Sequence, residues 1–248
     1  MRIGAVADIH LGTDSAGALR PALERLPEHA DVLLLGGDLT RHGTLDEARV
    51  VATEFADLPY PVVAILGNHD YHSDAERGIE ALLADHGLHV LECDSVTLTI
   101  GDETLGIAGA KGFGGGFAGK CASAFGERQM KQFAGHTEDI AAGLREALRS
   151  LDADVRVALT HYAPIKDTLR GEPPEIFPFL GSYLLGEPID EAGVDLAIHG
   201  HAHAGIERSA TPSGIPVRNV AQPVIRKAYA VYNVARAHAP DNRLPQGT

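Results

Sequence analysis

Residues 62–70 read Val-Val-Ala-Ile-Leu-Gly-Asn-His-Asp. Five consecutive apolar residues, two of them a Val pair, are typical of a strand that is covered on both faces. Three polar side chains, Asn68, His69 and Asp70, follow the turn at Gly67. Because ligands of open α/β sheets bind beyond the carboxyl ends of the strands, this stretch predicts a buried strand with a site at its end.

The same pattern occurs four more times, after apolar runs at 3–7, 32–36, 155–159 and 194–198. The polar segments that follow these runs are Asp8-Ile9-His10, Gly37-Asp38, Thr160-His161 and Gly200-His201-Ala202-His203. Carboxylate, amide and imidazole groups are ligands that suit divalent transition metals. Alternate residues of an extended segment share a side, so each D-x-H or H-x-H pair points the same way. The sequence therefore predicts a two-metal hydrolytic site.

The segments between these motifs predict an α/β fold. Helical patterns near 15–28, 44–56 and 76–86 alternate with the first apolar runs, as in βαβ units with a parallel sheet. Two further runs, 96–100 and 104–108, are separated by three turn residues and predict a hairpin. The remaining expected elements are a helix at 136–150 and shorter strands near 206–210, 216–221 and 228–233.

Composition limits the organisation and the partners of the chain. Its 248 residues predict one domain over 1–237, followed by a polar, disordered tail at 238–248. A net charge of −13 argues against a groove that tracks a nucleic-acid backbone. No apolar run approaches the roughly 20 residues of a membrane span. Only two cysteines are present, which favours a cytoplasmic protein without a disulfide framework.

Taken in order, the five motifs resemble the calcineurin-like metallophosphoesterase superfamily. The pattern of that family is D-x-H, G-D, G-N-H-[DE], a single His, and G-H-x-H, and it is matched here from residue 3 to about residue 203. The resemblance implies a four-layer α/β/β/α sandwich of two mixed sheets flanked by helices. It also implies a hydrolase that uses two divalent transition-metal ions (Mn, Fe or Zn) to cleave a small phosphoester.

The resemblance also implies a role for each motif residue. The residues implied to hold one metal are Asp8, His10, Asp38 and His203, and those implied to hold the other are Asp38, Asn68, His161 and His201. Asp38 is thus expected to bridge the two ions. His69 is expected to face the leaving-group oxygen instead of a metal, and Asp70 to set the tilt of the His69 ring.

Other residues near the motifs are candidates for contact with the substrate. His42, His72 and Phe113 are placed to line the pocket, although a solvated loop or simple packing fits them as well. His199 lies on the wrong side of its strand for a ligand, and we expect it to make a structural hydrogen bond.

Two irregular segments lie between the motifs. Residues 114–121 nearly match a P-loop, but Cys121 stands where the hydroxyl ligand of Mg²⁺ is required. We expect a flexible loop beside the active site, where Lys111 and Phe117 contact substrate or pack. The segment 171–180 is expected to form the rim of the pocket or the contact of a homodimer.

The expected reaction is hydrolysis of a small, nucleotide-like phosphodiester. His10 supplies the imidazole of the D-x-H motif that is often seen in diesterases of the family, and no large capping domain is apparent. A phosphomonoesterase is the alternative of the same class. The alternative of another class is a non-catalytic scaffold with a phosphoesterase fold, since fold alone does not prove activity.

Overall fold

A computed structural model describes residues 1–235, so the expected tail at 238–248 lies outside the described residues. The first sheet has the order β13-β1-β2-β3-β4. Strands β1 to β4 are parallel, and β13 runs antiparallel beside β1. Their bounds are β1 Arg2–Val6, β2 Val32–Gly36, β3 Val62–Ile65, β4 His89–Val90 and β13 Ala230–Asn233.

The second sheet has the order β11-β12-β10-β9-β6-β5. Its four inner strands are parallel, and the expected hairpin is formed by antiparallel β5 and β6. The bounds are β5 Asp94–Ile100, β6 Glu103–Ala110, β9 Val155–Thr160, β10 Leu196–His199, β11 Arg208–Ala210 and β12 Pro216–Asn219. A separate hairpin consists of β7 Gly116–Phe117 and β8 Lys120–Cys121.

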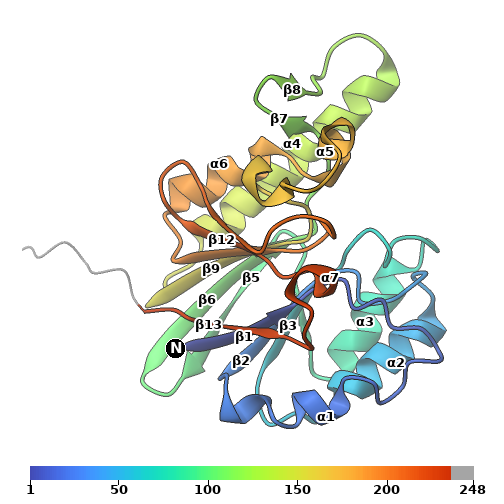
Figure 1. The fold of residues 1–248 in the computed structure, drawn as a ribbon, viewed down its shortest axis with the longest axis vertical. Coiled ribbons are helices and arrows are strands. Elements are labelled where there is room, and N and C mark those ends of the chain that lie inside the picture. The colour runs from blue at the N-terminus through green and yellow to red at the C-terminus, as the bar shows by residue number, and fades with distance from the viewer. Residues whose placement is uncertain (236–248) are drawn as a thin grey trace, which may run out of the picture.

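The longer helices cover the outer faces of the two sheets (Figure 1). Against the first sheet lie α2 and α3, and against the second sheet lie α4 and α6. The helix bounds are α1 Arg20–Leu23, α2 Leu45–Phe55, α3 Glu76–Asp85, α4 Arg128–Arg149, α5 Phe177–Leu180, α6 Tyr183–Ala192 and α7 Gln222–Ile225. Short 3₁₀ turns lie at Leu26–Glu28, Lys166–Leu169 and Pro174–Ile176.

The strands alternate between two cores, as side chains on a pleated sheet must. In β2, Leu34 packs between the sheets in the same cluster as Ile107 of β6 and Val157 of β9. Its neighbours Leu33 and Leu35 pack with α2 and α3 on the outer face. The expected four-layer α/β/β/α sandwich with two mixed sheets is therefore confirmed.

Two expected helices have different bounds in the structure. The pattern at 15–28 yields only α1 and a 3₁₀ turn, because Pro21 and Pro27 each start a new short segment and Gly17 adopts a positive φ. The helix expected at 136–150 instead begins at Arg128. Its first turns project above the sheets with β7 and β8 (Figure 1), where the apolar period that marks a covered helix is weak.

Candidate metal centre

The five motifs lie at the carboxyl ends of five strands, three in the first sheet and two in the second. Asp8 and His10 follow β1, Asp38 follows β2, and the segment 67–70 follows β3. His161 follows β9, and the segment 200–203 follows β10. Since both sheets bring these ends to one edge, residues far apart in sequence meet there: the amide of His201 donates to Oδ2 of Asp8 at 2.9 Å.

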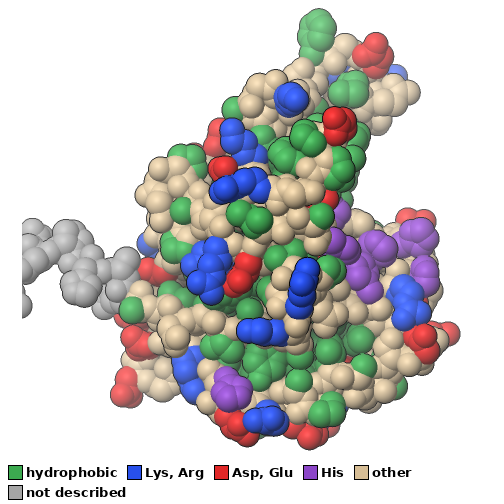
Figure 2. Space-filling view, in the orientation of Figure 1, with side chains coloured by type: hydrophobic (Ala, Val, Ile, Leu, Met, Phe, Trp, Pro, Cys, Tyr) green, Lys and Arg blue, Asp and Glu red, His purple; other side chains and the backbone are tan. Residues whose placement is uncertain are grey.

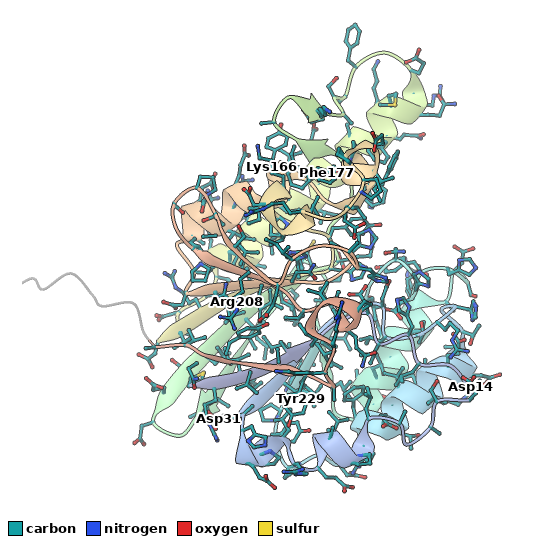
Figure 3. The ribbon with its side chains drawn as sticks, in the orientation of Figure 1. Asp14, Asp31, Lys166, Phe177, Arg208 and Tyr229 are labelled. Carbon is teal, nitrogen blue, oxygen red and sulfur yellow. The ribbon has the colours of Figure 1, made fainter. Side chains whose placement is uncertain are left out.

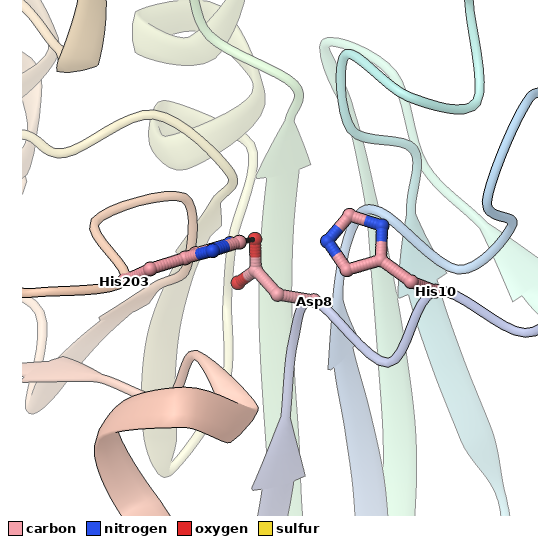
Figure 4. A group of neighbouring side chains, drawn as sticks. All are labelled: Asp8, His10 and His203. Atoms are coloured by element: carbon pink, nitrogen blue, oxygen red, sulfur yellow. Dashed lines mark hydrogen bonds and ion pairs between the residues drawn. The ribbon is translucent and has the colours of Figure 1, made fainter.

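The potential ligand atoms form three overlapping groups, each within 4.8 Å. The groups are Asp8–His10–His203, His10–Asp38–His69 and Asp38–His161–His201. Figure 4 shows the first group, with His203 and His10 on opposite sides of the Asp8 carboxylate. The first and third groups correspond to the two expected ligand sets, and the residues that join them are His10 and Asp38.

The Asp38 carboxylate lies between the two sets. Its Oδ2 is 3.8 Å from Nε2 of His10, and its Oδ1 is 3.4 Å from Nε2 of His161. The side chain is almost fully buried, and the amide of His69 donates to Oδ1 at 2.8 Å. Each oxygen thus faces a different set, which is the arrangement that a bridging carboxylate needs.

Four candidate ligands have a backbone in the left-handed region. The φ angles are 59° at Asp8, 45° at His10, 52° at Asp38 and 68° at His201. A non-glycine residue held there costs about 1–3 kcal/mol and persists only where the surroundings fix it, typically at functional sites. The concentration of such residues at this edge supports a function for the cluster.

Motif glycines allow the strand ends to approach closely. A Cβ added to Gly67 would collide with the backbone and carboxylate of Asp38, and one added to Gly200 would collide with Ala7 and Asp8. Each glycine therefore serves the packing of a neighbouring candidate ligand.

Backbone carbonyl groups determine which ring nitrogen of three histidines faces the cluster. Nδ1 of His161 lies 2.9 Å from the carbonyl oxygen of Gly36, Nδ1 of His69 lies 2.9 Å from that of Arg41, and Nε2 of His201 lies 3.2 Å from that of Phe179. A carbonyl oxygen only accepts, so each of these nitrogens carries the proton. The opposite ring nitrogen is left for the cluster, which is the orientation that neighbouring groups impose on metal-ligating histidines.

The distances between potential donor atoms fit a metal centre. Nε2 of His203 lies 2.9 Å from Oδ1 of Asp8, and Nε2 of His161 lies 3.0 Å from Oδ1 of Asn68. Ligand atoms bound at about 2.1 Å to one ion lie roughly 3 Å apart. Nδ1 of His10 is buried and has no hydrogen-bond partner among the described residues. The donor set of carboxylate, amide and imidazole groups therefore fits two divalent transition-metal ions.

Electrostatics favour a charged carboxylate at Asp8 and a neutral imidazole at His201, whereas the hydrogen bond with Asp8 raises the pKa of His203. Burial opposes ionisation of Asp8, but the hydrogen bond with His203 and the nearby imidazoles outweigh it and lower the pKa of the carboxyl. Burial lowers the pKa of His201 to about 3, with a further contribution from His161. A neutral imidazole keeps the lone pair that a metal requires.

Asp70 does not contact the His69 ring, and the expected pairing of these two residues is wrong. Its fully buried carboxylate accepts hydrogen bonds from the amides of Gly67 at 2.8 Å, Thr40 at 2.8 Å and Leu39 at 3.2 Å, and from the Thr40 hydroxyl at 2.6 Å. Burial raises the pKa of this carboxyl, and the hydrogen bonds oppose that rise. Asp70 thus ties the loop after β2 to the loop after β3, and the Arg41 carbonyl orients His69 instead.

The other histidines near the motifs are distributed as follows. His199 is fully buried with both ring nitrogens bonded, to the Gly200 carbonyl and the Thr168 hydroxyl, which is the expected structural role. His42 is exposed and its Nδ1 lies 2.9 Å from Glu47, and its ring centroid is 6.3 Å from that of His72. Figure 2 shows histidine side chains gathered where the upper part of the molecule meets the lower part.

The Gly-rich segment is packed and tied to the second irregular segment. The amide of Gly115 donates to the Pro178 carbonyl at 2.7 Å, and the amide of Gly116 donates to the Gly181 carbonyl at 2.9 Å. Gly114 to Gly116 are buried, so this part differs from the expected free loop. Its glycines permit the backbones to approach, since a Cβ on Gly114 would collide with Pro178. The segment 171–180 in turn reaches the cluster through the Phe179 carbonyl.

Some residues of the site gave no signal in the sequence. The orienting carbonyls of Gly36, Arg41 and Phe179 carry no side-chain signature and act across long sequence separations. Tyr162 follows His161, and its ring centroid lies 4.3 Å from that of His201. An aromatic residue next to a ligand is too common a feature to have identified it.

Solved structures with the same fold come from several functional contexts. A phosphopantetheinyl hydrolase (PptH) from Mycobacterium tuberculosis has a TM-score of 0.65 at 13% identity, covering 99% of this chain and 98% of that chain. A putative 5′-nucleotidase from Staphylococcus aureus has a TM-score of 0.56 at 13% identity, covering 88% of this chain and 48% of that chain. GAP50, described as the anchor in the inner membrane complex of Plasmodium, has a TM-score of 0.53 at 12% identity, covering 90% and 72%. At these identities the likeness establishes the fold alone.

A match to a family model, and not to any single curated protein, shows the family of the chain. No curated protein sequence matches the chain significantly. Among the described residues, no helix is long and apolar enough to cross a membrane. The model of the calcineurin-like phosphoesterase family matches residues 1–205, which include all five motifs. The chain therefore belongs to the calcineurin-like phosphoesterase family and is a metal-dependent phosphoester hydrolase.

Proposed function

We propose that the chain, as a single catalytic domain over 1–237, hydrolyses a small nucleotide-like phosphodiester with two divalent transition-metal ions. The observation that carries this proposal is the Asp38 carboxylate, whose two oxygens face His10 and His161 from separate ligand sets. One ion would be held by Asp8, His10, Asp38 and His203, and the other by Asp38, Asn68, His161 and His201. Manganese, iron and zinc all suit these donors.

Bound divalent ions supply Lewis acidity at the phosphoryl group and lower the pKa of water. His69 lies at the open side of the cluster, with Nε2 4.0 Å from Oδ2 of Asp38 and with nearly half of its side chain exposed. Because Nδ1 donates to the Arg41 carbonyl, Nε2 is the atom that can deliver a proton to the departing alkoxide oxygen, and it does so from the doubly protonated imidazolium form of the ring. His42, His72 and Phe113 are proposed as contacts for the rest of the substrate.

The preference for a diester is tested with a panel of phosphoesters in the presence of Mn²⁺. The panel contains bis(p-nitrophenyl) phosphate, p-nitrophenyl phosphate and cyclic nucleotides. It also contains a phosphopantetheinyl ester, because one solved structure with the same fold is a phosphopantetheinyl hydrolase. We expect a kcat/KM at least tenfold higher for the aryl diester than for the aryl monoester. A reversed preference would establish the phosphomonoesterase alternative.

A non-catalytic scaffold is the alternative from another class, and the anchor description of GAP50 gives it a precedent on this fold. A scaffold has no need of a full ligand set, whereas all seven candidate ligands are present here and close together. Metal-loaded protein that hydrolyses nothing in the panel would favour the scaffold.

We also propose a compartment and an assembly for the chain. Cys93 and Cys121 are free thiols, which supports a cytoplasmic location. A homodimer through the segment 171–180 has support from the exposed side chain of Ile176. Light scattering on the purified protein measures the mass directly, and a monomeric mass would exclude the dimer.

A further inference from the structure

Aromatic side chains line one side of the candidate metal centre. Their ring centroids lead away from His201 in a connected series: Tyr162 lies 4.3 Å from His201, Phe113 lies 5.8 Å from Tyr162, and Phe133 lies 5.2 Å from Phe113. The ring of Phe179 then lies 6.4 Å from that of Phe133 in an edge-to-face arrangement.

The rings nearest His201, those of Tyr162 and Phe113, make contacts within the protein. The buried Nζ of Lys111 lies 4.9 Å from the ring centroid of Tyr71, 5.1 Å from that of Phe113 and 5.4 Å from that of Tyr162. A cation held against aromatic faces is an attractive contact. Phe113 is also covered by His136 at 4.8 Å. Tyr162 is buried and Phe113 is partly covered, so these rings form a fixed wall beside the centre.

Phe179, at the outer end of the wall, is different because 61% of it is exposed. Its backbone is held firmly, since its carbonyl accepts from Nε2 of His201 and the neighbouring carbonyls of Pro178 and Leu180 accept from Gly115 and Ala163. Figure 3 labels Phe177, which begins the same short helix α5, in the upper part of the molecule. An exposed ring on a held backbone loses little conformational freedom when it binds a flat ligand.

We propose that Phe179 is a specificity-determining residue that stacks on a flat aromatic ring, a nucleobase or an aryl group, in the alcohol portion of the substrate. The inference rests on the proposed phosphoester hydrolysis and adds the chemistry of the group attached to the phosphate. The backbone of Phe179 lies against the candidate metal centre, because its carbonyl contacts His201, and the exposed ring on this backbone can therefore meet a group attached to the phosphate. Stacking suits this role because every aromatic group offers a π-face.

The experiment compares two diesters with the same p-nitrophenolate leaving group, benzyl p-nitrophenyl phosphate and methyl p-nitrophenyl phosphate. The quantity measured is the ratio of kcat/KM for the benzyl ester to that for the methyl ester. In Phe179→Ala this ratio should fall at least fivefold, mainly through KM, which matches the loss of one stacked ring. Phe179→Trp should keep the ratio. The matched control is Phe125→Ala, which removes a ring that is 83% exposed.

Metal content is measured in every variant. Phe179→Ala retains the carbonyl that contacts His201, so its metal content should equal that of the wild type. An unchanged ratio in Phe179→Ala, or an equal fall in Phe125→Ala, overturns the inference and leaves the proposed function intact. An equal fall in kcat/KM for both esters, together with a loss of bound metal, also overturns it, since Phe179 would then only support His201. Wild-type protein that binds metal and cleaves neither ester refutes the proposed function itself.

Discussion

Backbone carbonyl groups orient the histidine rings at the cluster, one residue at a time. The carbonyl groups of Gly36, Arg41 and Phe179 each accept a hydrogen bond from one ring nitrogen, so the opposite nitrogen of His161, His69 and His201 is available. The same chemistry separates a structural histidine from a candidate ligand, because both nitrogens of His199 are already bonded. The sequence motifs identified which histidines matter, whereas these carbonyl partners depend on the folded chain and leave no trace in the sequence.

Replacement of His69 by alanine should lower turnover and leave the metal content unchanged. The reason is that Nε2 of His69 is placed to protonate a leaving group, and loss of a general acid typically costs ~10²–10⁴-fold in kcat. The loss should be smaller for p-nitrophenyl esters than for alkyl esters, because p-nitrophenolate leaves without a proton. The measurement is kcat on both kinds of ester with elemental analysis in parallel. Equal losses on both esters would show that His69 is not the proton donor.

Replacement of Asp38 by alanine should reduce metal binding more than replacement of His10. Asp38 presents one oxygen to each ligand set, whereas His10 adds a terminal nitrogen. Metal per chain, measured by elemental analysis after dialysis, should approach zero in Asp38→Ala and remain near one in His10→Ala. The bridging role would be contradicted by the same partial loss in both variants.

At the scale of the elements, the loops after β2 and β3 are joined through Asp70 and Gly67. The Asp70 carboxylate accepts from donors on both loops, and Gly67 lets the second loop lie against Asp38. Sequence patterns predicted the strands before these loops correctly, because long apolar runs are strong signals. They did not predict α6, whose interior contains Pro188, or the two-residue strands β4, β7 and β8, which are too short to show a period.

Replacement of Asp70 by alanine should destabilise the protein even without metal. The amides of Leu39, Thr40 and Gly67 would lose their acceptor in a buried place, at about 1–3 kcal/mol for each unsatisfied donor. We expect the free energy of unfolding in urea to fall by about 3 kcal/mol or more. The control is Asp139→Ala on the exposed side of α4, which should change stability by about 0.5 kcal/mol or less. A similar small change in Asp70→Ala would mean that Asp70 does not hold the loops.

For the whole molecule, the site exists only because two sheets end at one edge. The order of strands along the chain predicted an α/β fold, and the family resemblance supplied the second sheet. Local patterns could not show that β13, from the end of the described chain, completes the first sheet beside β1. They also could not show that the loop after β10 returns to Asp8, a contact across 193 residues. Such pairings arise from packing over the whole chain, which no local period encodes.

Metal stoichiometry is the decisive test of a two-ion metal centre built around Asp38. Wild-type protein is loaded with Mn²⁺, dialysed, and analysed for metal per chain and for hydrolysis of bis(p-nitrophenyl) phosphate along a chelator titration. We predict two ions per chain, with hydrolysis that disappears as metal is removed and returns when Mn²⁺ is restored. A stoichiometry of one or none, or hydrolysis that persists in metal-free protein, would exclude a two-ion centre.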